Sequence, residues 1–391
     1  MNDALQADRT ALADTVRRFA AAEIAPHVTA WDEAGEFPRA LYTQAAGLGL
    51  LGLGYPESLG GTPATHALKM AMTVAIARHG ASGGVLASLF SHNIGLPLVL
   101  LHASEAVCHE VIPPVLRGEK IAALAITEPG GGSDVAALRT TARRATDAEG
   151  DHYVVNGEKT FITSGVRADW ISVAVRTGES RGAAGISMLL VPGDAAGLSR
   201  TRLAKMGWLC SDTATLHFDN VRVPARYLLG AEGAGFRMIM ANFNGERLAL
   251  AAGALGFAQA CLDEALAWAR ARKTFGASLL DHQAIRHKLA DMQMRIASTE
   301  AWVDAVAAQG DALEAQGSAN APEWVAAICL LKNHATQTMQ FCADAAVQIL
   351  GGMGFMRGTV SERIYREVKV MMIGGGAEEI MKELAAKQLG W

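Results

Sequence analysis

One uninterrupted run of helix-forming residues constrains the fold of this chain more than any other stretch. Between Asn242 and Gly276 the sequence is rich in alanine and leucine and contains no proline, which predicts one continuous helix. At a rise of about 1.5 Å per residue, that helix places Glu246 about 39 Å from Arg272. One small-molecule site cannot easily span this distance. If both ends contribute to a cofactor site, they serve different copies of that site, so we expect a homo-oligomer.

Composition limits the classes of function to consider. The chain has 391 residues, of which 50% are hydrophobic and 19% charged, and this is ordinary for a soluble enzyme of two or three domains. The formal net charge of -4 gives no broad basic field of the kind that binds nucleic acid. The five cysteines are scattered without a CxxC pair, so the sequence indicates neither a disulfide framework nor a zinc site, and we expect no metal.

Localisation follows from similarly simple features. Reduced thiols fit a cytosol, and the N-terminal residues lack the apolar core of a signal peptide, so we expect a cytoplasmic protein. The apolar runs are too short to cross a bilayer or are broken by glycine, proline or charge, so we expect no membrane insertion.

Changes in periodicity divide the chain into three expected domains. Residues 1–120 alternate alanine-rich helical stretches with glycine and proline breaks and predict a helical domain. Residues 121–231 contain short β-type runs and predict a small β-barrel or sandwich. Residues 232–391 return to helical periodicity and predict a four-helix bundle. The expected fold is therefore mainly α with a central β domain.

Finer features can be placed on these domains. In the first domain, residues 4–29 and 37–61 each read as helical. In the β domain, Asn156-Gly157 stands between two β-type runs and predicts a hairpin turn.

Glycine-rich and polar loops supply the candidate binding elements. ALAITEPGGGSD (123–134) ends an apolar strand in hydroxyl and glycine residues, which let a backbone lie against a flat or anionic ligand, although a plain turn fits equally well. RKTFG (272–276) and QILGGMG (348–354) offer a guanidinium and a glycine-backed glutamine suited to pyrophosphate and ribityl groups. A helix C-cap and close helix packing are the alternatives for these two loops.

The motifs occur together in a recognisable order. TEPGGGSD, NGEKTFITSG, KMGW with Ser211-Asp212-Thr213, RKTFG, QILGGMG and REVKVMMIGGGAEEI follow the order and approximate spacing of the acyl-CoA dehydrogenase family, which the whole chain resembles. The resemblance implies an N-terminal helical domain, a middle β domain and a C-terminal helical bundle. It also implies FAD bound between the subunits of a tetramer or dimer.

Residue by residue, the resemblance implies a divided flavin site. The contacts expected from one subunit are Ile126, Thr127, Phe161 and Thr163, and those expected from its neighbour are Arg272, Phe275, Gln283, Gln348 and Gly352. Ser133 resembles the residue that touches the pantetheine part of the thioester, and Arg247 resembles the one that binds CoA.

Two departures from the family concern the flavin. The family often has tryptophan where Phe161 stands, so stacking is expected with a smaller ring. The segment that usually reads Thr-x-Gln is Ala377-Glu378-Glu379, which adds charge near a phosphate-bearing ligand, and these residues are not assigned to the site.

The position of the catalytic carboxylate is the most informative departure. Many members carry glutamate in a Tyr-Glu-Gly segment, and the matching positions here are Gly374-Gly375-Gly376. A subgroup resembling isovaleryl-CoA and long-chain acyl-CoA dehydrogenases places the carboxylate just before the arginine of the long helix, where Glu246 stands. The alternative is that Glu246 merely favours the dipole of a helix start. Because Gly375 cannot take a proton, Glu246 is the predicted base.

The resemblance then implies a reaction. Glu246 removes the α-proton of an acyl-CoA thioester, while the Gly375 N–H and a flavin ribityl hydroxyl stabilise the enolate oxygen. A hydride passes from Cβ to flavin N5, which yields trans-2-enoyl-CoA, and an electron-transfer flavoprotein is the expected acceptor. Burial beside the acyl chain should raise the pKa of Glu246.

Substrate and alternatives remain open at this level. The three glycines at 374–376 remove bulk near the reacting carbons, which suggests a branched, cyclic or otherwise wide acyl group. Alternatives on the same scaffold are an acyl-CoA oxidase, which would release peroxide, and a sulfinoacyl-CoA desulfinase, which would release sulfite. A non-catalytic flavin or DNA-associated binding protein is disfavoured because Glu246 and Arg247 are both present and no basic C-terminal extension occurs.

Overall fold

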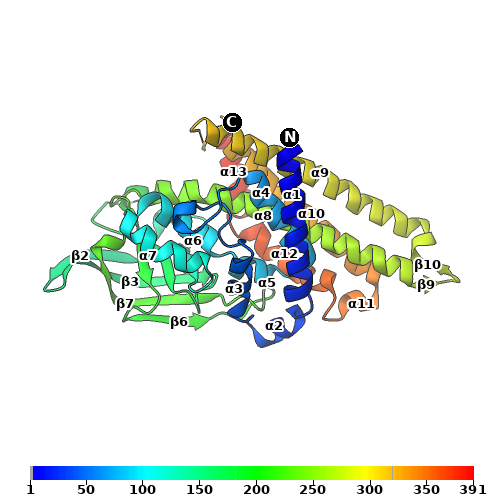
Figure 1. Cartoon of the computed structure of the whole chain (residues 1–391), viewed down its shortest axis with the longest axis horizontal. Helices are drawn as coiled ribbons and strands as arrows, with labels where there is room; N and C mark the ends of the chain where they lie inside the picture. The colour runs from blue at the N-terminus through cyan, green and yellow to red at the C-terminus, as the bar shows by residue number, and fades with distance from the viewer. Residues whose placement is uncertain (1–2, 181, 319) are drawn as a thin grey trace.

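The computed structural model describes residues 3–180, 182–318 and 320–391. Helices gather at one side of the molecule and a twisted sheet at the other, with the first helices of the chain packed across their junction (Figure 1). The expected class, mainly α with a central β domain, is confirmed.

The first part of the chain is helical. Its helices are α1 (Asp3–Phe19), α2 (Val28–Ala34), α3 (Ala40–Gly47), α4 (His66–Gly80), α5 (Gly83–Leu89), α6 (His92–His102) and α7 (Glu105–Leu116). The helix expected over residues 4–29 is interrupted, because α1 runs into a π-helical turn at Ala20–Ile24 before α2 begins. The helix expected over 37–61 is limited to α3, and the glycine-rich remainder forms turns.

The middle of the chain forms one mixed sheet. Its strands are β1 (Ala122–Ala125), β2 (Thr141–Asp147), β3 (Gly150–Ile162), β4 (Trp170–Arg176), β5 (Ile186–Pro192), β6 (Leu198–Arg202), β7 (Ala214–Pro224) and β8 (Leu228–Leu229). The main path through the sheet is β6-β7-β3-β2-β4-β5-β8, and β1 pairs in parallel with β4. The inward-facing residues of β4 and β5 form the centre of its core.

The hairpin turn predicted at Asn156-Gly157 is wrong. These residues lie inside β3, where the pairing with β7 shifts register between Val155 and Gly157. Gly157 has a φ of 141°, and a Cβ at this position would stand 2.7 Å from the Thr140 Cα atom. Glycine is therefore required by a bulge and a close backbone approach, which give the same dipeptide signal as a turn.

The last part of the chain is a helical bundle. It comprises α8 (Gly235–Ala271), the short hairpin of β9 (Lys273–Thr274) and β10 (Ala277–Ser278), α9 (Gln283–Ala315), α10 (Pro322–Leu350), α11 (Gly352–Phe355), α12 (Val360–Ile373) and α13 (Glu378–Gln388). The predicted long helix is α8, which runs unbroken for 37 residues and packs mainly against α4, α9 and α10.

Two helical stretches are apolar and long enough to cross a membrane by length and composition. They are Gly83–His102 and Gly235–Ala271, of whose apolar windows 61% and 78% are buried inside the fold. Both stretches pack against other helices of the fold. Buried core helices of large domains have the same apolar character.

Candidate functional site

The loop after β1 and the end of β3 lie against each other. The Thr160 N–H donates to the Thr127 carbonyl oxygen at 2.8 Å. The Lys159 Nζ atom donates to the Ile126 carbonyl oxygen at 3.0 Å and forms an ion pair with Glu128 at 2.8 Å. These bonds bring Ile126 and Thr127 next to the strand end that carries the other two residues expected from the same subunit.

Phe161 shows an unusual conformation at this end of β3. Its φ is +60°, which is rare for a side chain with a Cβ, and its ring is 69% exposed. A strained residue that presents an apolar ring to solvent is typical of a binding site rather than of a packed core. Thr163, two residues later, is half-buried. The arrangement fits a flat aromatic ligand such as a flavin ring.

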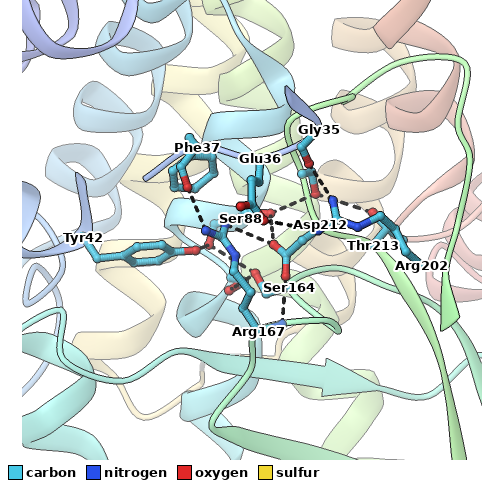
Figure 2. Close-up of polar contacts among 12 residues, drawn as sticks. Gly35, Glu36, Phe37, Tyr42, Ser88, Ser164, Arg167, Arg202, Asp212 and Thr213 are labelled. Carbon is cyan, nitrogen blue, oxygen red and sulfur yellow. Dashed lines mark hydrogen bonds and ion pairs between the residues drawn. The ribbon is translucent and has the colours of Figure 1, made fainter. Parts of the chain in front are cut away.

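A buried polar network holds the turn that follows Phe161 (Figure 2). The Ser164 hydroxyl donates to the Ser91 hydroxyl at 2.9 Å. The backbone N–H and guanidinium of Arg167 both donate to the carboxylate of fully buried Asp212, and the guanidinium also lies over the Phe37 ring at 4.9 Å. Three distant segments thus fix one turn. Asp212 stands out in the sequence only as part of a motif, and no local pattern reveals its partner.

The other expected flavin contacts lie at the far end of the helical bundle. Arg272 follows the last residue of α8, and Phe275 stands at the tip of the β9–β10 hairpin with a φ of +52° and a ring that is 99% exposed. Gln283 begins α9, while Gln348 and Gly352 lie where α10 ends and α11 begins, and all three are exposed.

The two sets of expected flavin contacts are not brought together within one chain. Figure 1 shows the hairpin and α11 at the end of the bundle that points away from the sheet. Residues 161–163 lie in the sheet domain, and α8 carries Arg272 away from that domain over its full length. A complete site built from both sets therefore requires two copies of the chain. Each set has the exposed ring and polar groups that fit one part of FAD.

Glu246 and Gly375 are neighbours in space although 129 positions separate them in the chain. A Cβ atom built on Gly375 would lie 3.7 Å from the Glu246 Oε1 atom. The same Cβ would lie 2.7 Å from the Cδ1 atom of Leu250, which stands one helical turn after Glu246. Positions 246 and 375, the two places for a base considered from the sequence, therefore face the same space. The carboxylate in that space is the one of Glu246.

The environment of Glu246 suits a base. Its burial raises its pKa to about 6, and the nearby charges of Arg247 and Lys332 oppose this shift. Within the described ranges 3–180, 182–318 and 320–391, its carboxylate oxygens accept no hydrogen bond from the protein, so they are free to receive a proton.

Arg247 faces residues Gly374–Gly376, called the glycine loop below. Its side chain is buried, its Nε atom donates to the Gly375 carbonyl oxygen at 2.9 Å, and its guanidinium lies over the Phe243 ring at 5.4 Å. Ser133, the other residue expected to contact the CoA thioester, is exposed in the loop after β1. The predicted contact of Arg247 with CoA stays a prediction, and the guanidinium has a defined partner within the chain.

Lys332 is a residue of this region that the sequence analysis missed. It lies on the buried face of α10, and its Nζ atom donates to the carbonyl oxygens of Met372 at 2.9 Å and Gly376 at 2.8 Å. A lysine within the apolar run AICLLKNHA is a visible signal, because charged residues are almost never fully buried without a partner.

The segment Ala377-Glu378-Glu379, left outside the expected site, begins α13. The Glu378 carboxylate pairs with Lys382 at 2.7 Å and accepts a hydrogen bond from Gln337 at 2.7 Å. Its charge is therefore compensated within the chain.

One group of side chains has the composition of a metal site. The ligand atoms of His66, Asp311 and Glu314 lie within 4.8 Å of one another. The Asp311 carboxylate accepts hydrogen bonds from the backbone N–H groups of His66 and Ala67 at the start of α4, and Glu314 contacts the His66 ring at 2.9 Å. These contacts are those of a helix cap, and the expectation of a metal-free protein stays a prediction.

Comparison with known proteins gives a consistent set of similarities. Family models described as the N-terminal, middle and C-terminal domains of acyl-CoA dehydrogenase match residues 6–119, 123–221 and 233–390. Cyclohexane-1-carbonyl-CoA dehydrogenase of Geobacter metallireducens is 35% identical over 378 residues, which cover 96% of each chain.

Solved structures agree with these matches. The acyl-CoA dehydrogenase of Geobacillus kaustophilus is 32% identical and superimposes with a TM-score of 0.90 over 100% of this chain and 99% of its own. An acyl-CoA dehydrogenase of Bacillus anthracis complexed with FAD is 29% identical, with a TM-score of 0.90 over 98% of this chain and 68% of its own.

Proposed function

This chain belongs to the acyl-CoA dehydrogenase family, and we propose that it oxidises an acyl-CoA thioester to the trans-2-enoyl-CoA with Glu246 as the base. The observation that carries the proposal is the placement of the Glu246 Oε1 atom 3.7 Å from the Cβ position of Gly375. A carboxylate from either residue would reach the same reacting carbon. Although Gly375 has no carboxylate, the site therefore still has a base, which is Glu246.

The family is FAD-dependent, and the residues of this chain fit the cofactor. Ile126, Thr127, Phe161 and Thr163 would hold the flavin on one subunit, and Arg272, Phe275, Gln283, Gln348 and Gly352 would hold it from the neighbour. Bound FAD supplies the acceptor for the hydride that leaves Cβ of the thioester. The exposed rings of Phe161 and Phe275 support this assignment, because both present apolar surface that a single chain leaves uncovered.

The protein's own groups account for the proton transfer. A thioester α-proton is weakly acidic, so negative charge on the carbonyl oxygen must be stabilised while Glu246 takes the proton. The Gly375 N–H is the backbone donor proposed for that oxygen. Arg247 supports it by binding the Gly375 carbonyl oxygen at 2.9 Å. A carboxylate with a pKa near 6 is ionised at neutral pH and is more basic than one in water.

The shape of the site bears on the acyl group. Three glycines at 374–376 remove side-chain bulk beside Glu246, which supports a branched, cyclic or otherwise wide substrate. The Leu250 side chain fills part of this space, because its Cδ1 atom stands 2.7 Å from the Cβ position of Gly375. The similarity to a cyclohexane-1-carbonyl-CoA dehydrogenase favours a wide acyl group over a short linear one.

Partners and location complete the proposal. We propose an electron-transfer flavoprotein as the acceptor, a cytoplasmic location, no membrane insertion, and a homodimer or homotetramer as the working form. The separation of the two sets of flavin contacts along α8 supports the oligomer. Oxidase and desulfinase activities remain the competing functions on this scaffold.

Anaerobic stopped-flow measurement of flavin bleaching tests the function directly. Wild-type protein is mixed with isovaleryl-, cyclohexane-1-carbonyl-, butyryl- and longer acyl-CoAs, in parallel with Glu246→Gln. We expect rapid bleaching by a wide acyl-CoA and its near-complete loss in the variant. Equal rates in the variant would remove Glu246 as the base. Peroxide in air would identify an oxidase, and sulfite from a sulfinated acyl-CoA would identify a desulfinase.

A further inference from the structure

Lys332 is fully buried without a salt bridge in the part of the chain that the structure describes. The other fully buried lysine, Lys159, forms an ion pair with Glu128 at 2.8 Å. Lys332 instead donates to two backbone carbonyl oxygens, those of Met372 and Gly376. Burial and the repulsion of Arg247 lower its pKa to about 8. Such a costly placement calls for a role that an apolar side chain cannot fill.

The two carbonyl groups stand at the two ends of the glycine loop: Met372 lies two residues before Gly374, and Gly376 is the last residue of the loop. Gly375 and Gly376 have φ values of 69° and 116°, and glycine loses more conformational freedom on ordering than any other residue. Fixing the backbone of each such residue has a cost in conformational entropy. Three successive glycines therefore need external contacts to hold one conformation.

Lys332 and Arg247 together supply those contacts. Arg247 binds the Gly375 carbonyl oxygen, while Lys332 binds the carbonyl oxygens of Met372 and Gly376. Each peptide is planar, so fixing a carbonyl oxygen also fixes the N–H of the following residue. Lys332 thus holds one peptide before and one peptide after the peptide that carries the Gly375 N–H.

The ammonium charge acts on Glu246 as well. Arg247 and Lys332 are the two cations whose charges favour the ionised form of Glu246 against the effect of burial. One side chain on α10 therefore contacts the loop that carries the proposed oxyanion donor and stabilises the charge of the proposed base.

We propose that Lys332 is a positioning residue for the dehydrogenation, which orders the Gly374–Gly376 loop so that the Gly375 N–H faces the thioester oxygen and places a positive charge near Glu246. The inference rests on the function proposed above, and it assigns to Lys332 no direct contact with substrate or cofactor. The observations behind it are the two carbonyl contacts of Lys332, the complete burial of its side chain and the nearness of its charge to Glu246 and Arg247.

Two variants separate the contacts from the charge. Lys332→Met keeps the length and apolar volume of the side chain but removes both donors and the charge. Lys332→Gln keeps a donor and removes the charge. In Lys332→Met we expect the rate of flavin reduction to fall by about 10–100-fold, less than the roughly 100–1000-fold that loss of a whole oxyanion donor causes. Lys332→Gln should be intermediate in rate.

The pH profile reports on the charge. Without the ammonium group, the midpoint of the acidic limb of the flavin-reduction rate should move to higher pH in both variants, by a similar amount. A merely structural lysine would leave that midpoint where it is in wild type.

Binding of an enolate-forming thioester gives a readout without turnover. Acetoacetyl-CoA loses its acidic proton readily, and its enolate resembles the charged species that the loop would stabilise. Titration calorimetry of the FAD-loaded protein should show at least about a tenfold weaker Kd for acetoacetyl-CoA in Lys332→Met, with the Kd of CoA unchanged.

Thr336→Val is the matched control. Thr336 lies one turn further along α10, is also buried, and donates to the backbone oxygens of Lys332 and Asn333 without contacting the glycine loop. We expect wild-type rate, pH midpoint and Kd ratio in this variant.

The outcomes distinguish the two proposals. If no acyl-CoA reduces wild-type protein, the proposed function fails and this inference falls with it. If wild type is reduced and both lysine variants keep its pH midpoint and its ratio of Kd values, only the role of Lys332 is refuted, whatever their stability. A shifted midpoint with a selective loss of acetoacetyl-CoA affinity supports it, and Lys332→Gln serves alone if Lys332→Met does not fold.

Discussion

The Leu250 side chain occupies the place where a side chain on Gly375 would begin, with its Cδ1 atom 2.7 Å from that Cβ position. The contact is shorter than two carbon atoms tolerate, so a residue larger than glycine at 375 must displace Leu250. The backbone adds a second obstacle, because the φ of Gly375 is +69°.

Replacement of Gly375 by alanine should therefore lower stability for two separable reasons. The left-handed φ should cost about 1–2 kcal/mol, and the contact with Leu250 about 1–3 kcal/mol. Gly317 has the same φ of +69° and open space at its Cβ position, so Gly317→Ala measures the first cost alone. Chemical unfolding of both variants gives the difference. In a Leu250→Ala background the two substitutions should cost the same, and a persistent difference would show that Leu250 is not the obstacle.

The rate of flavin reduction should depend on the ionisation of Glu246. Its pKa of about 6 means that the carboxylate is ionised above pH 6 and protonated below it. The rate should therefore fall about tenfold for each pH unit well below 6. Stopped-flow reduction by one acyl-CoA between pH 5 and 8 measures this limb. A rate that is flat across the range would mean that no group with this pKa limits the proton transfer.

Removal of the Glu246 charge should stabilise the fold at alkaline pH. The carboxyl group has a higher pKa in the folded state than its ordinary 4.5, so its ionisation disfavours folding as pH rises through about 6. Glu246→Gln should gain about 1–2 kcal/mol in the free energy of unfolding at pH 8, and the gain should shrink towards pH 5. Urea unfolding at the two pH values checks this. A gain that is equal at both would point to packing rather than charge as its cause.

Phe275 should matter for assembly and cofactor retention but not for the stability of one chain. Phe275 is 99% exposed at the hairpin tip and meets the His282 ring only edge-on, with the centroids 6.2 Å apart, so Phe275→Ala removes little contact within the subunit. We expect faster release of FAD and a weaker oligomer, measured by flavin fluorescence and sedimentation velocity. Leu101→Ala is a suitable control, because that side chain is 72% exposed and lies on the first helical domain. Wild-type FAD release in Phe275→Ala would remove this ring from the flavin site.

The prediction from sequence succeeded where one signal extended over many residues. The proline-free run at 242–276 contains enough helix-forming residues to override its internal glycines, and α8 is continuous through it. The alternation between helical and β-type periodicity gave the three-part organisation for the same reason. These patterns depend on neighbours in the chain, which a reader of the sequence can see.

Prediction failed where contacts between distant segments decide the structure. Asn156-Gly157 has the composition of a hairpin turn, but β7 pairs along β3 on both sides of it and makes it a bulge. Lys332 stands out in an apolar run, but the sequence around it does not show that its partners are the carbonyl groups of Met372 and Gly376. The same holds for Leu250, whose relation to Gly375 depends on how α8 packs against the loop after α12. In none of these three cases can the partner segment be read from the neighbouring residues.

Helix α8 has a consequence for mixed assemblies. In the proposed oligomer the base at position 246 works in one site, while Arg272 at the end of the same helix works in the next, so every subunit is shared between two sites. Two inactive proteins, Glu246→Gln and Arg272→Ala, should therefore complement each other when their subunits are mixed. In a hybrid pair both defects fall in one site and the other site is intact, so activity returns although neither parent has any.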